Sequence, residues 1–285
     1  KRRCPTAEVG HRRFSMLTPM LDICTVNVNG IRAAARRGGV AWLESAGHDV
    51  VLLQEVRASA SQLAGVTEDW TAGHVAAAAS VQAGRSGVAI VSRLPLREVR
   101  EGFGVADVDD SGRWLEAVVD TNIGPIRVVS VYVHSGEADT DKQVAKYRFL
   151  GVLSARMAAL LASGEPVLIA GDINVAHTER DIKNAKGNRG KAGYLPEEQA
   201  YLSAWLAAGW VDLGRAHAGD VDGPYTWWSW RGQAFDRNVG WRIDYGFASP
   251  TLAQYCTAVY VERAASYDQR WSDHAPVVFS FTAPE

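Results

Sequence analysis

The sequence predicts an α/β protein whose core is a mixed or antiparallel β-sheet structure with helices packed outside. Three observations support this fold class. Short apolar, β-branched runs recur along the chain, helical patterns separate only some of them, and no Ser/Pro-rich linker or charge block divides the 285 residues. A strictly alternating doubly wound sheet fits less well, because several predicted strands follow one another directly. We therefore expect one domain over residues 21–285.

The predicted strands are β-branched apolar runs bounded by turn residues, as buried strands should be. Two of these segments, Arg113–Val119 and Ile126–Val131, are joined through Asn122-Ile123-Gly124 and are predicted to pair as a hairpin. The full set is Leu21–Val28, Val50–Leu53, Val88–Val91, Leu115–Val119, Ile126–Val131, Val167–Ala170, Arg242–Phe247, Cys256–Val261 and Ala275–Phe281.

Three segments have helical patterns. The first, Ile31–Ala46, starts after Gly30, and the longest covers Asp141–Leu161. The third, Pro196–Ala208, has a proline in its first turn and ends before a glycine, which is the preferred arrangement of these two residues at helix ends.

Composition limits the possible partners and environment. The net charge of −2 gives no global argument for a nucleic-acid partner, so local patches must supply one. Cys4, Cys24 and Cys256 lack metal-binding spacing, and we expect reduced thiols. No apolar run approaches the roughly 18 residues of a membrane span. We expect a flexible basic N-terminal tail over residues 1–20, a cytoplasmic location, no membrane partner and a monomer.

Polar residues stand where the first two predicted strands end. Asn27 and Asn29 are two positions apart, so in an extended segment they point to the same side. A simple turn or helix N-cap is the alternative interpretation. Glu55 ends a fully apolar strand, where a carboxylate is costly to bury unless a cation or Arg57 compensates its charge.

Two further strands end in groups that suit phosphate chemistry. The hydroxyl of Tyr132 can donate to a phosphate oxygen, although a half-buried structural tyrosine is the alternative. Gly171 permits a close approach to the backbone. Asp172 beyond it can orient or deprotonate a water, while Asn174 can hold water or phosphate.

A carboxylate and a histidine near the carboxyl end complete the candidate site. If Asp244 accepts from one nitrogen of His274, it favours the imidazolium, and the other nitrogen can donate to a phosphoryl oxygen. Asp273 lies directly before this histidine. Together with Asn and Glu on other segments, these residues could hold a divalent cation and an oxyanion. Unrelated loop residues are the alternative.

The order and spacing of these segments resemble the exonuclease III/AP endonuclease family, within the wider exonuclease–endonuclease–phosphatase superfamily. The resemblance runs from about Leu21 to Phe281. Its motifs are NVNGIR at 27–32, LQE at 53–55, Tyr132, GDINVAHTERDIKN at 171–184, YTWWSWRG at 225–232, WRIDY at 241–245 and SDHAPV at 272–277. The chain departs from the family pattern at His134-Ser135, where proline followed by Asn or Gln is usual.

The resemblance implies a four-layered α/β sandwich in which two mixed β-sheets pack face to face with helices outside. It implies Mg²⁺, with Mn²⁺ as a substitute, held by Glu55 as the principal ligand. The further residues implied at or near the metal are Asn27, Asp172, Asn174 and Asp273. The implied catalytic residues are Tyr132, Asp172, Asn174, Asp244 and His274.

The resemblance also implies a substrate: double-stranded DNA carrying abasic sites or 3′ ends. Trp227 and Trp241 would form an apolar slot for the base-free sugar, and Arg231 would probe the duplex. An aromatic core cluster and a solvated basic loop are the alternatives for these segments. The other residues implied in substrate binding are Asn29, Arg57, Ser135, Asn184, Lys186, Asn188 and Lys191.

The function implied is cleavage 5′ to abasic sites, with 3′→5′ exonuclease and 3′-phosphatase or 3′-phosphodiesterase activity. One alternative is a hydrolase of the same superfamily that acts on another, non-DNA phosphoester. Another is a non-catalytic DNA-binding module. The tryptophan-rich loop and the basic loop disfavour the first alternative, and the retained acidic residues and histidine disfavour the second.

Overall fold

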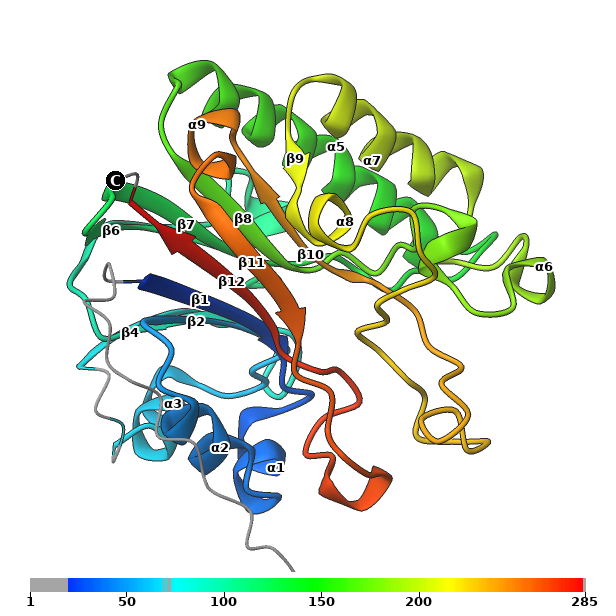
Figure 1. Ribbon diagram of the computed structural model, residues 1–285, viewed down its shortest axis with the longest axis horizontal. Coiled ribbons are helices and arrows are strands. Elements are labelled where there is room, and N and C mark those ends of the chain that lie inside the picture. Colours follow the sequence, from blue (N-terminus) through cyan, green and yellow to red (C-terminus); the bar gives the residue numbers. More distant parts are fainter. Residues whose placement is uncertain (1–19, 69, 71–72, 284–285) are drawn as a thin grey trace, which may run out of the picture.

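The computed structural model describes residues 20–68, 70 and 73–283, and these residues form two six-stranded sheets (Figure 1). The strand orders are β11-β12-β1-β2-β4-β3 and β5-β6-β7-β8-β10-β9. One neighbouring pair in each sheet is parallel, β1–β2 in the first and β7–β8 in the second, and the other pairs are antiparallel. The predicted mixed sheets are confirmed. The expected tail lies outside the described residues except for Met20, and so does Cys4.

The first sheet contains most of the strands from the two ends of the chain. Its central strand β1 is paired on one side with β2 and on the other with β12, so the first and last of the described strands are neighbours in this sheet. The strands are β1 (Met20–Asn27), β2 (Val50–Gln54), β3 (His74–Ala78), β4 (Val88–Ser92), β11 (Cys256–Val261) and β12 (Val277–Thr282).

The second sheet contains the predicted hairpin, which is confirmed by antiparallel pairing of β6 and β7. Strand β8 runs parallel to β7, and β10 runs antiparallel to β8. The strands are β5 (Leu96–Glu101), β6 (Trp114–Thr121), β7 (Gly124–Tyr132), β8 (Val167–Asp172), β9 (Val211–Asp212) and β10 (Asp244–Ala248).

Helices cover the outer sides of both sheets. The long helix α5 and helix α7 lie outside the second sheet, and α1, α2 and α3 lie on the opposite outer side of the molecule (Figure 1). The helices are α1 (Ile31–Arg36), α2 (Gly39–Ala46), α3 (Ala60–Val66), α4 (Ala106–Asp109), α5 (Asp141–Ser163), α6 (Ala185–Asn188), α7 (Pro196–Ala207), α8 (Leu213–Ala218) and α9 (Pro250–Ala253), with 3-10 turns at Glu179–Asp181 and Tyr267–Gln269.

Three apolar clusters hold these four layers together. The central cluster joins the sheets, with Leu52 from one and Leu168 from the other fully buried. A second cluster packs α5 and α7 on the second sheet, and a third packs α1 to α3 on the first. Cys24 is buried and Cys256 half-buried, and both thiols are free, as predicted. No helix among the described residues is long and apolar enough to cross a membrane.

The structure corrects two details of the sequence prediction. The helix expected over Ile31–Ala46 is two helices, separated at Arg37 and Gly38. Gly38 adopts the left-handed conformation, and Gly39 packs so closely on Trp271 that a Cβ there would lie 2.6 Å from the indole ring.

Three strands were missed, namely β3, β5 and β9. All three lie at sheet edges, and β5 presents mostly exposed residues. Edge strands do not require the continuous apolar runs by which buried strands are recognised.

The strand directions bring the predicted polar residues to one edge of the sandwich. Each parallel pair, β1–β2 and β7–β8, ends at the same edge of its sheet. Strands β12 and β10 run antiparallel to their neighbours, so they begin at that edge. Four strand ends and two strand starts therefore meet at a single site.

Candidate active site

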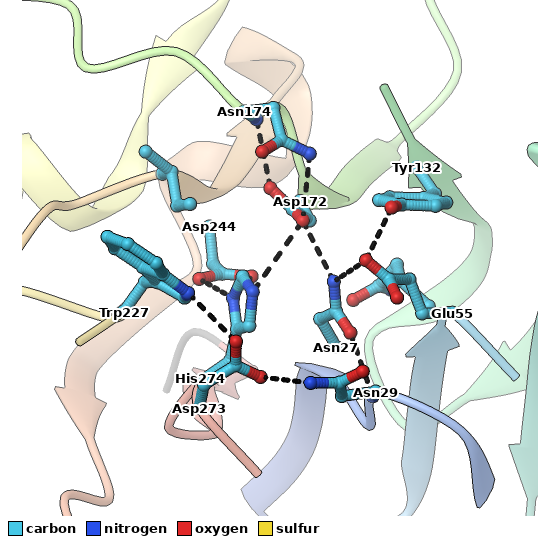
Figure 2. Close-up of polar contacts among 12 residues, drawn as sticks. Asn27, Asn29, Glu55, Tyr132, Asp172, Asn174, Trp227, Asp244, Asp273 and His274 are labelled. Carbon is cyan, nitrogen blue, oxygen red and sulfur yellow. Dashed lines mark hydrogen bonds and ion pairs between the residues drawn. The ribbon is translucent and has the colours of Figure 1, made fainter. Parts of the chain in front are cut away.

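The centre of the site is a hydrogen-bonded chain that links the two sheets (Figure 2). The Asn27 side-chain amide donates to Glu55 at 3.2 Å and to Asp172 at 2.9 Å. Asn27 is fully buried at the end of β1, Glu55 follows β2, and Asp172 ends β8. The two carboxylates therefore lie on either side of one amide group.

Asp172 is oriented from a second direction by Asn174. The backbone N–H of Asn174 donates to one carboxylate oxygen of Asp172 at 2.9 Å, and its side-chain amide donates to the other at 3.1 Å. Gly171 makes the strand pairing here possible, because a Cβ on it would lie 1.9 Å from the Val131 carbonyl oxygen. The predicted close backbone approach is thus present.

His274 and Asp244 form a buried ion pair beside Asp172. The Nδ1 atom of His274 lies 2.9 Å from Asp244, and its Nε2 atom lies 3.8 Å from Asp172. Burial alone lowers the pKa of His274, but attraction to Asp244 and Asp172 outweighs it and raises the pKa to about 10. The histidine is therefore an imidazolium at neutral pH, with Nε2 turned towards Asp172.

The protonation of Asp172 is finely balanced. Burial and repulsion from Asp244 and Glu55 raise its pKa, whereas His274 and the Asn27 amide lower it, and the result is a pKa of about 7. A carboxylate with this pKa can take up a proton near neutral pH, which is the property required of a general base.

Asp273 belongs to a neighbouring polar group. It accepts from the Asn29 amide at 2.8 Å and from the Trp227 indole at 3.1 Å. Burial opposes its ionisation, but the charge of His274 and these two hydrogen bonds hold the pKa of Asp273 below its ordinary value. Asp273 is therefore a permanent carboxylate, and it joins the tryptophan loop to the segment after β1.

Tyr132 ends β7 with its hydroxyl donating to Glu55. Burial and the charges of Glu55 and Asp172 raise the pKa of Tyr132, so the hydroxyl keeps its proton and remains a donor. The guanidinium of Arg113 lies 4.4 Å from the centre of the tyrosine ring. This face-on contact holds the ring in place and adds positive charge behind the site.

Three residues of the site have a left-handed backbone. Asn29, Glu55 and Asn174 have φ angles of 49°, 49° and 55°. Asparagine tolerates this region, but for a residue such as Glu55 it costs about 1 kcal/mol or more. Such strain gathers at functional sites, where it aims side chains that a relaxed backbone would turn away.

Two tryptophans form a wall next to the polar cluster. Trp227 and Trp241 meet edge to face with ring centres 6.0 Å apart, and backbone hydrogen bonds pair the two residues. Gly193, at the end of the predicted basic loop, packs close to both the Trp241 ring and the Asn174 carbonyl. Ile182, directly before the loop, forms an isolated β-bridge with Trp241, so the basic loop starts and ends beside this wall.

The structure separates the predicted residues into two groups. The central ones converge: Asn27, Asn29, Glu55, Tyr132, Asp172, Asn174, Trp227, Asp244, Asp273 and His274 (Figure 2). Arg57 pairs with Glu55 from the surface, and Trp241 packs on Trp227. The remaining predicted residues lie on surrounding loops, where all but the half-buried Asn188 are exposed, and their side chains form no hydrogen bond or ion pair with the polar cluster: Ser135, Asn184, Lys186, Asn188, Lys191 and Arg231.

Two residues that contact catalytic side chains were not assigned a role from the sequence, namely Thr226 and Arg113. Thr226 donates to Asp244 at 2.6 Å and accepts from two backbone N–H groups at 3.1 Å, so it fixes the carboxylate that holds His274. Arg113 could have been found from the hairpin, because the paired register of β6 and β7 places it opposite Tyr132.

The donors present suit a hard divalent cation. A close carboxylate–histidine cluster exists at Asp172, Asp244 and His274, with ligand atoms within 4.8 Å of one another. We interpret these three residues as an ion-pair network and not as a metal site, since the charged imidazole of His274 already supplies positive charge between the two carboxylates. Glu55, Asp273 and the Asn27 amide instead offer oxygen donors, which Mg²⁺ and Mn²⁺ prefer.

The fold and this edge-of-sheet acidic site define an α/β-sandwich hydrolase. The profile of the Endonuclease/Exonuclease/phosphatase family matches residues 24–274, and the chain belongs to that family. It is 34% identical to an exodeoxyribonuclease of Bacillus subtilis over 90% of this chain and 98% of that protein. The sequence-based resemblance to the exonuclease III/AP endonuclease group is confirmed.

Solved structures agree with this assignment. An AP endonuclease from Archaeoglobus fulgidus superimposes with a TM-score of 0.81 at 27% identity, covering 92% of this chain and 99% of that one. The 3′ phosphatase NExo from Neisseria, bound to a product DNA hairpin, superimposes with the same TM-score, identity and coverage. The four-layered sandwich is thereby confirmed.

Proposed function

We propose that this protein is a divalent-metal-dependent DNA-repair phosphodiesterase that cleaves duplex DNA 5′ to abasic sites and also removes nucleotides or phosphate from 3′ ends. The observation that carries the proposal is the arrangement around Asp172. A carboxylate with a pKa near 7 faces a buried imidazolium across 3.8 Å, which places a base and a phosphate-binding cation together. The relatives named exodeoxyribonuclease and AP endonuclease support it.

Glu55, Asp273 and Asn27 would hold the cation, with Asp172 and Asn174 beside it. When bound, Mg²⁺ would neutralise charge on the phosphoryl oxygens and on the leaving oxygen. The strained backbone at Glu55 supports this role, because it turns the carboxylate into the polar centre, where Asn27 and Tyr132 donate to it.

The chain's own residues divide the reaction between them. Asp172, oriented by two bonds from Asn174, takes a proton as water attacks phosphorus. His274 donates from Nε2 to a phosphoryl oxygen and stabilises the charge that develops there, while Asp244 keeps it protonated. The Tyr132 hydroxyl binds a second oxygen. The bond from phosphorus to the 3′-oxygen breaks, and this oxygen takes a proton from solvent, leaving a 3′-hydroxyl and a 5′-phosphate.

Substrate choice would come from the aromatic wall and the exposed basic residues. The apolar faces of Trp227 and Trp241 suit a sugar that has lost its base, because an intact nucleotide would need more room and polar partners. Asn29 and Arg57 would contact the strand near the metal, and Arg231 would enter the duplex. Ser135, Asn184, Lys186, Asn188 and Lys191 would contact phosphates on either side.

Cleavage of three oligonucleotide duplexes tests the proposal. One carries an internal abasic site, one a recessed 3′ end and one a 3′-phosphate, and each is incubated with Mg²⁺ and with EDTA. We expect a nick 5′ to the abasic site that EDTA abolishes. If none of the three duplexes is cleaved with Mg²⁺ or Mn²⁺, while an unrelated phosphomonoester is hydrolysed, the DNA-repair function is wrong.

A further inference from the structure

We propose that Lys146 is a positioning residue, whose buried ammonium fixes the two loops that carry the catalytic groups. Lys146 lies on α5 and Glu198 on α7, and both side chains are fully buried. Their charged groups are 2.6 Å apart. Lys146 reaches the two loops through backbone carbonyls and not through their catalytic side chains, so its influence on the reaction is indirect. This inference rests on the proposed nuclease function for its activity measurement.

The ammonium has three acceptors, which is the number of hydrogens that it can donate. Besides Glu198, it donates to the Asn174 carbonyl at 2.9 Å and to the Ser135 carbonyl at 3.3 Å. Ser135 follows Tyr132 in one loop, and Asn174 follows Asp172 in the other. One side chain therefore ties together the backbones of two segments that leave adjacent strands, β7 and β8.

Stability alone does not account for this arrangement. A buried ion pair loses most of its Coulombic attraction to the desolvation of its two charges, and apolar residues of similar size stabilise a protein equally well. Apolar residues would, however, leave the Asn174 and Ser135 carbonyls without a donor. The specific contribution of Lys146 is thus the position of these two carbonyls.

The position of the Asn174 backbone, which Lys146 holds through the carbonyl, determines the orientation of Asp172. Asn174 has a left-handed backbone, and its N–H and side-chain amide orient both oxygens of Asp172. The same amide also donates to the Val133 carbonyl at 2.9 Å, in the loop on the other side. A change in the backbone angles of Asn174 that released its carbonyl would also move its N–H and its side chain relative to one another, and with them both bonds that orient Asp172.

The loop after Tyr132 packs directly on α5, around Gly136. A Cβ on Gly136 would lie 2.4 Å from the Gln143 side-chain oxygen and 2.9 Å from the Cδ atom of Lys146. Gln143 in turn donates to Glu198 at 2.8 Å. The loop after Tyr132 therefore lies directly on the helix, and the lysine is the donor that holds it there.

The test removes both charges together. The variant Lys146→Met/Glu198→Gln keeps a side-chain oxygen for Gln143 and avoids an unpaired buried carboxylate. The matched control is Arg156→Met/Glu116→Gln. Arg156 is on the same helix and binds the buried Glu116 at 2.6 and 2.7 Å, but it contacts neither loop. Both variants and the wild type are compared by thermal unfolding, amide hydrogen exchange and steady-state cleavage of an abasic duplex.

We expect the Lys146 variant to lose about 10- to 100-fold in kcat with KM changed less than about 3-fold, because a misplaced base slows chemistry without weakening DNA binding. Amide exchange should rise at 133–136 and 173–176 only. The control should keep the wild-type kcat and the wild-type exchange in both loops.

Unchanged exchange in both loops of the Lys146 variant would overturn the inference, as would an equal fall of kcat in the control. A wild type that cleaves no DNA would refute the proposed function instead. In that case the exchange comparison still decides whether Lys146 positions the loops.

Discussion

Replacing Asp244 with asparagine tests the electrostatic core of the mechanism. The substitution keeps the shape of the side chain and its bond from Thr226, but it removes the charge 2.9 Å from the Nδ1 atom of His274. After burial, which acts in the opposite direction, Asp244 is the largest influence on the pKa of His274, and Asp172 is the next. The pKa of His274 should therefore fall in the variant, because only the weaker attractions of Asp172 and Asp273 remain to hold its proton.

The size of the effect follows from the geometry. One opposite charge at this distance changes a pKa by about 1 to 3 units, which corresponds to roughly 1.4 to 4 kcal/mol. The pKa of His274 should thus fall from about 10 to about 7 to 9. The wild-type imidazole stays charged throughout the neutral range. In the variant, a growing fraction is neutral as the pH rises above 7, so the phosphate-binding charge is lost.

The assay is an NMR titration of the histidine side chains in EDTA, followed by nicking rates between pH 6.5 and 9. His177, which binds Ser203 at 2.8 Å and lies away from this ion pair, serves as the internal reference and should titrate unchanged. In the variant, the nicking rate should fall more steeply with rising pH than in the wild type. A His274 that titrates alike in both proteins would refute the electrostatic reasoning.

Three further outcomes are expected. Asp172→Asn should lower Mg²⁺-dependent nicking of an abasic duplex by at least about 100-fold with duplex binding retained, because it removes the base. For the same reason, the wild-type nicking rate should fall as the pH drops below 7, where protonation of Asp172 removes the base. Trp227→Ala should relax discrimination against undamaged DNA more than it slows cleavage. His134→Phe should raise the free energy of unfolding in urea above that of the wild type, and this gain should be larger at pH 5 than at pH 7.5. Burial, with Arg113 and Lys146, lowers the pKa of His134 to about 3, so the unfolded chain binds the proton first and stability is lost as the pH falls from about 6.5 towards 3.

Each outcome has a control or a contrary result. Binding of the abasic duplex, measured in Ca²⁺, shows whether Asp172→Asn has disturbed more than chemistry, and unchanged nicking would contradict its role. Trp227→Phe keeps the aromatic wall but loses the bond to Asp273, so it should retain discrimination. An equal loss of cleavage on all substrates after Trp227→Ala would contradict the pocket. For His134→Phe, an identical gain at both pH values would indicate better packing on Phe149 instead.

The sequence determined most of the core elements. Buried strands such as β2 and β8 are continuous apolar runs, so their positions follow from local composition, and only their ends differ from prediction. Helices α5 and α7 were also predicted within a few residues, because a proline or a glycine marks their ends. The break between α1 and α2 was missed although Gly38-Gly39 marks it locally, since Gly38 adopts a left-handed conformation. The contact of Gly39 with Trp271, far away in the chain, is visible only in the folded molecule.

The residues of the candidate site could be predicted from their types and motifs, but not their contacts. Asn27 bonds to Asp172 across 145 positions, and only the packing of two sheets brings them together. Arg113 carries no motif, and Thr226 stands in the YTWWSWRG segment without a role that its residue type reveals. Their roles became visible only through the register of the hairpin and the bond to Asp244.

The sequence by itself therefore determined the fold class, the family and the chemical groups available for catalysis. The tertiary structure decided which of those groups touch and which are charged. The physical reason is that strand and helix formation depends on neighbours along the chain, whereas a pKa depends on burial and on charges a few ångströms away. The pKa values of Asp172 and His274, and the buried ammonium of Lys146 behind them, exist only in the folded molecule.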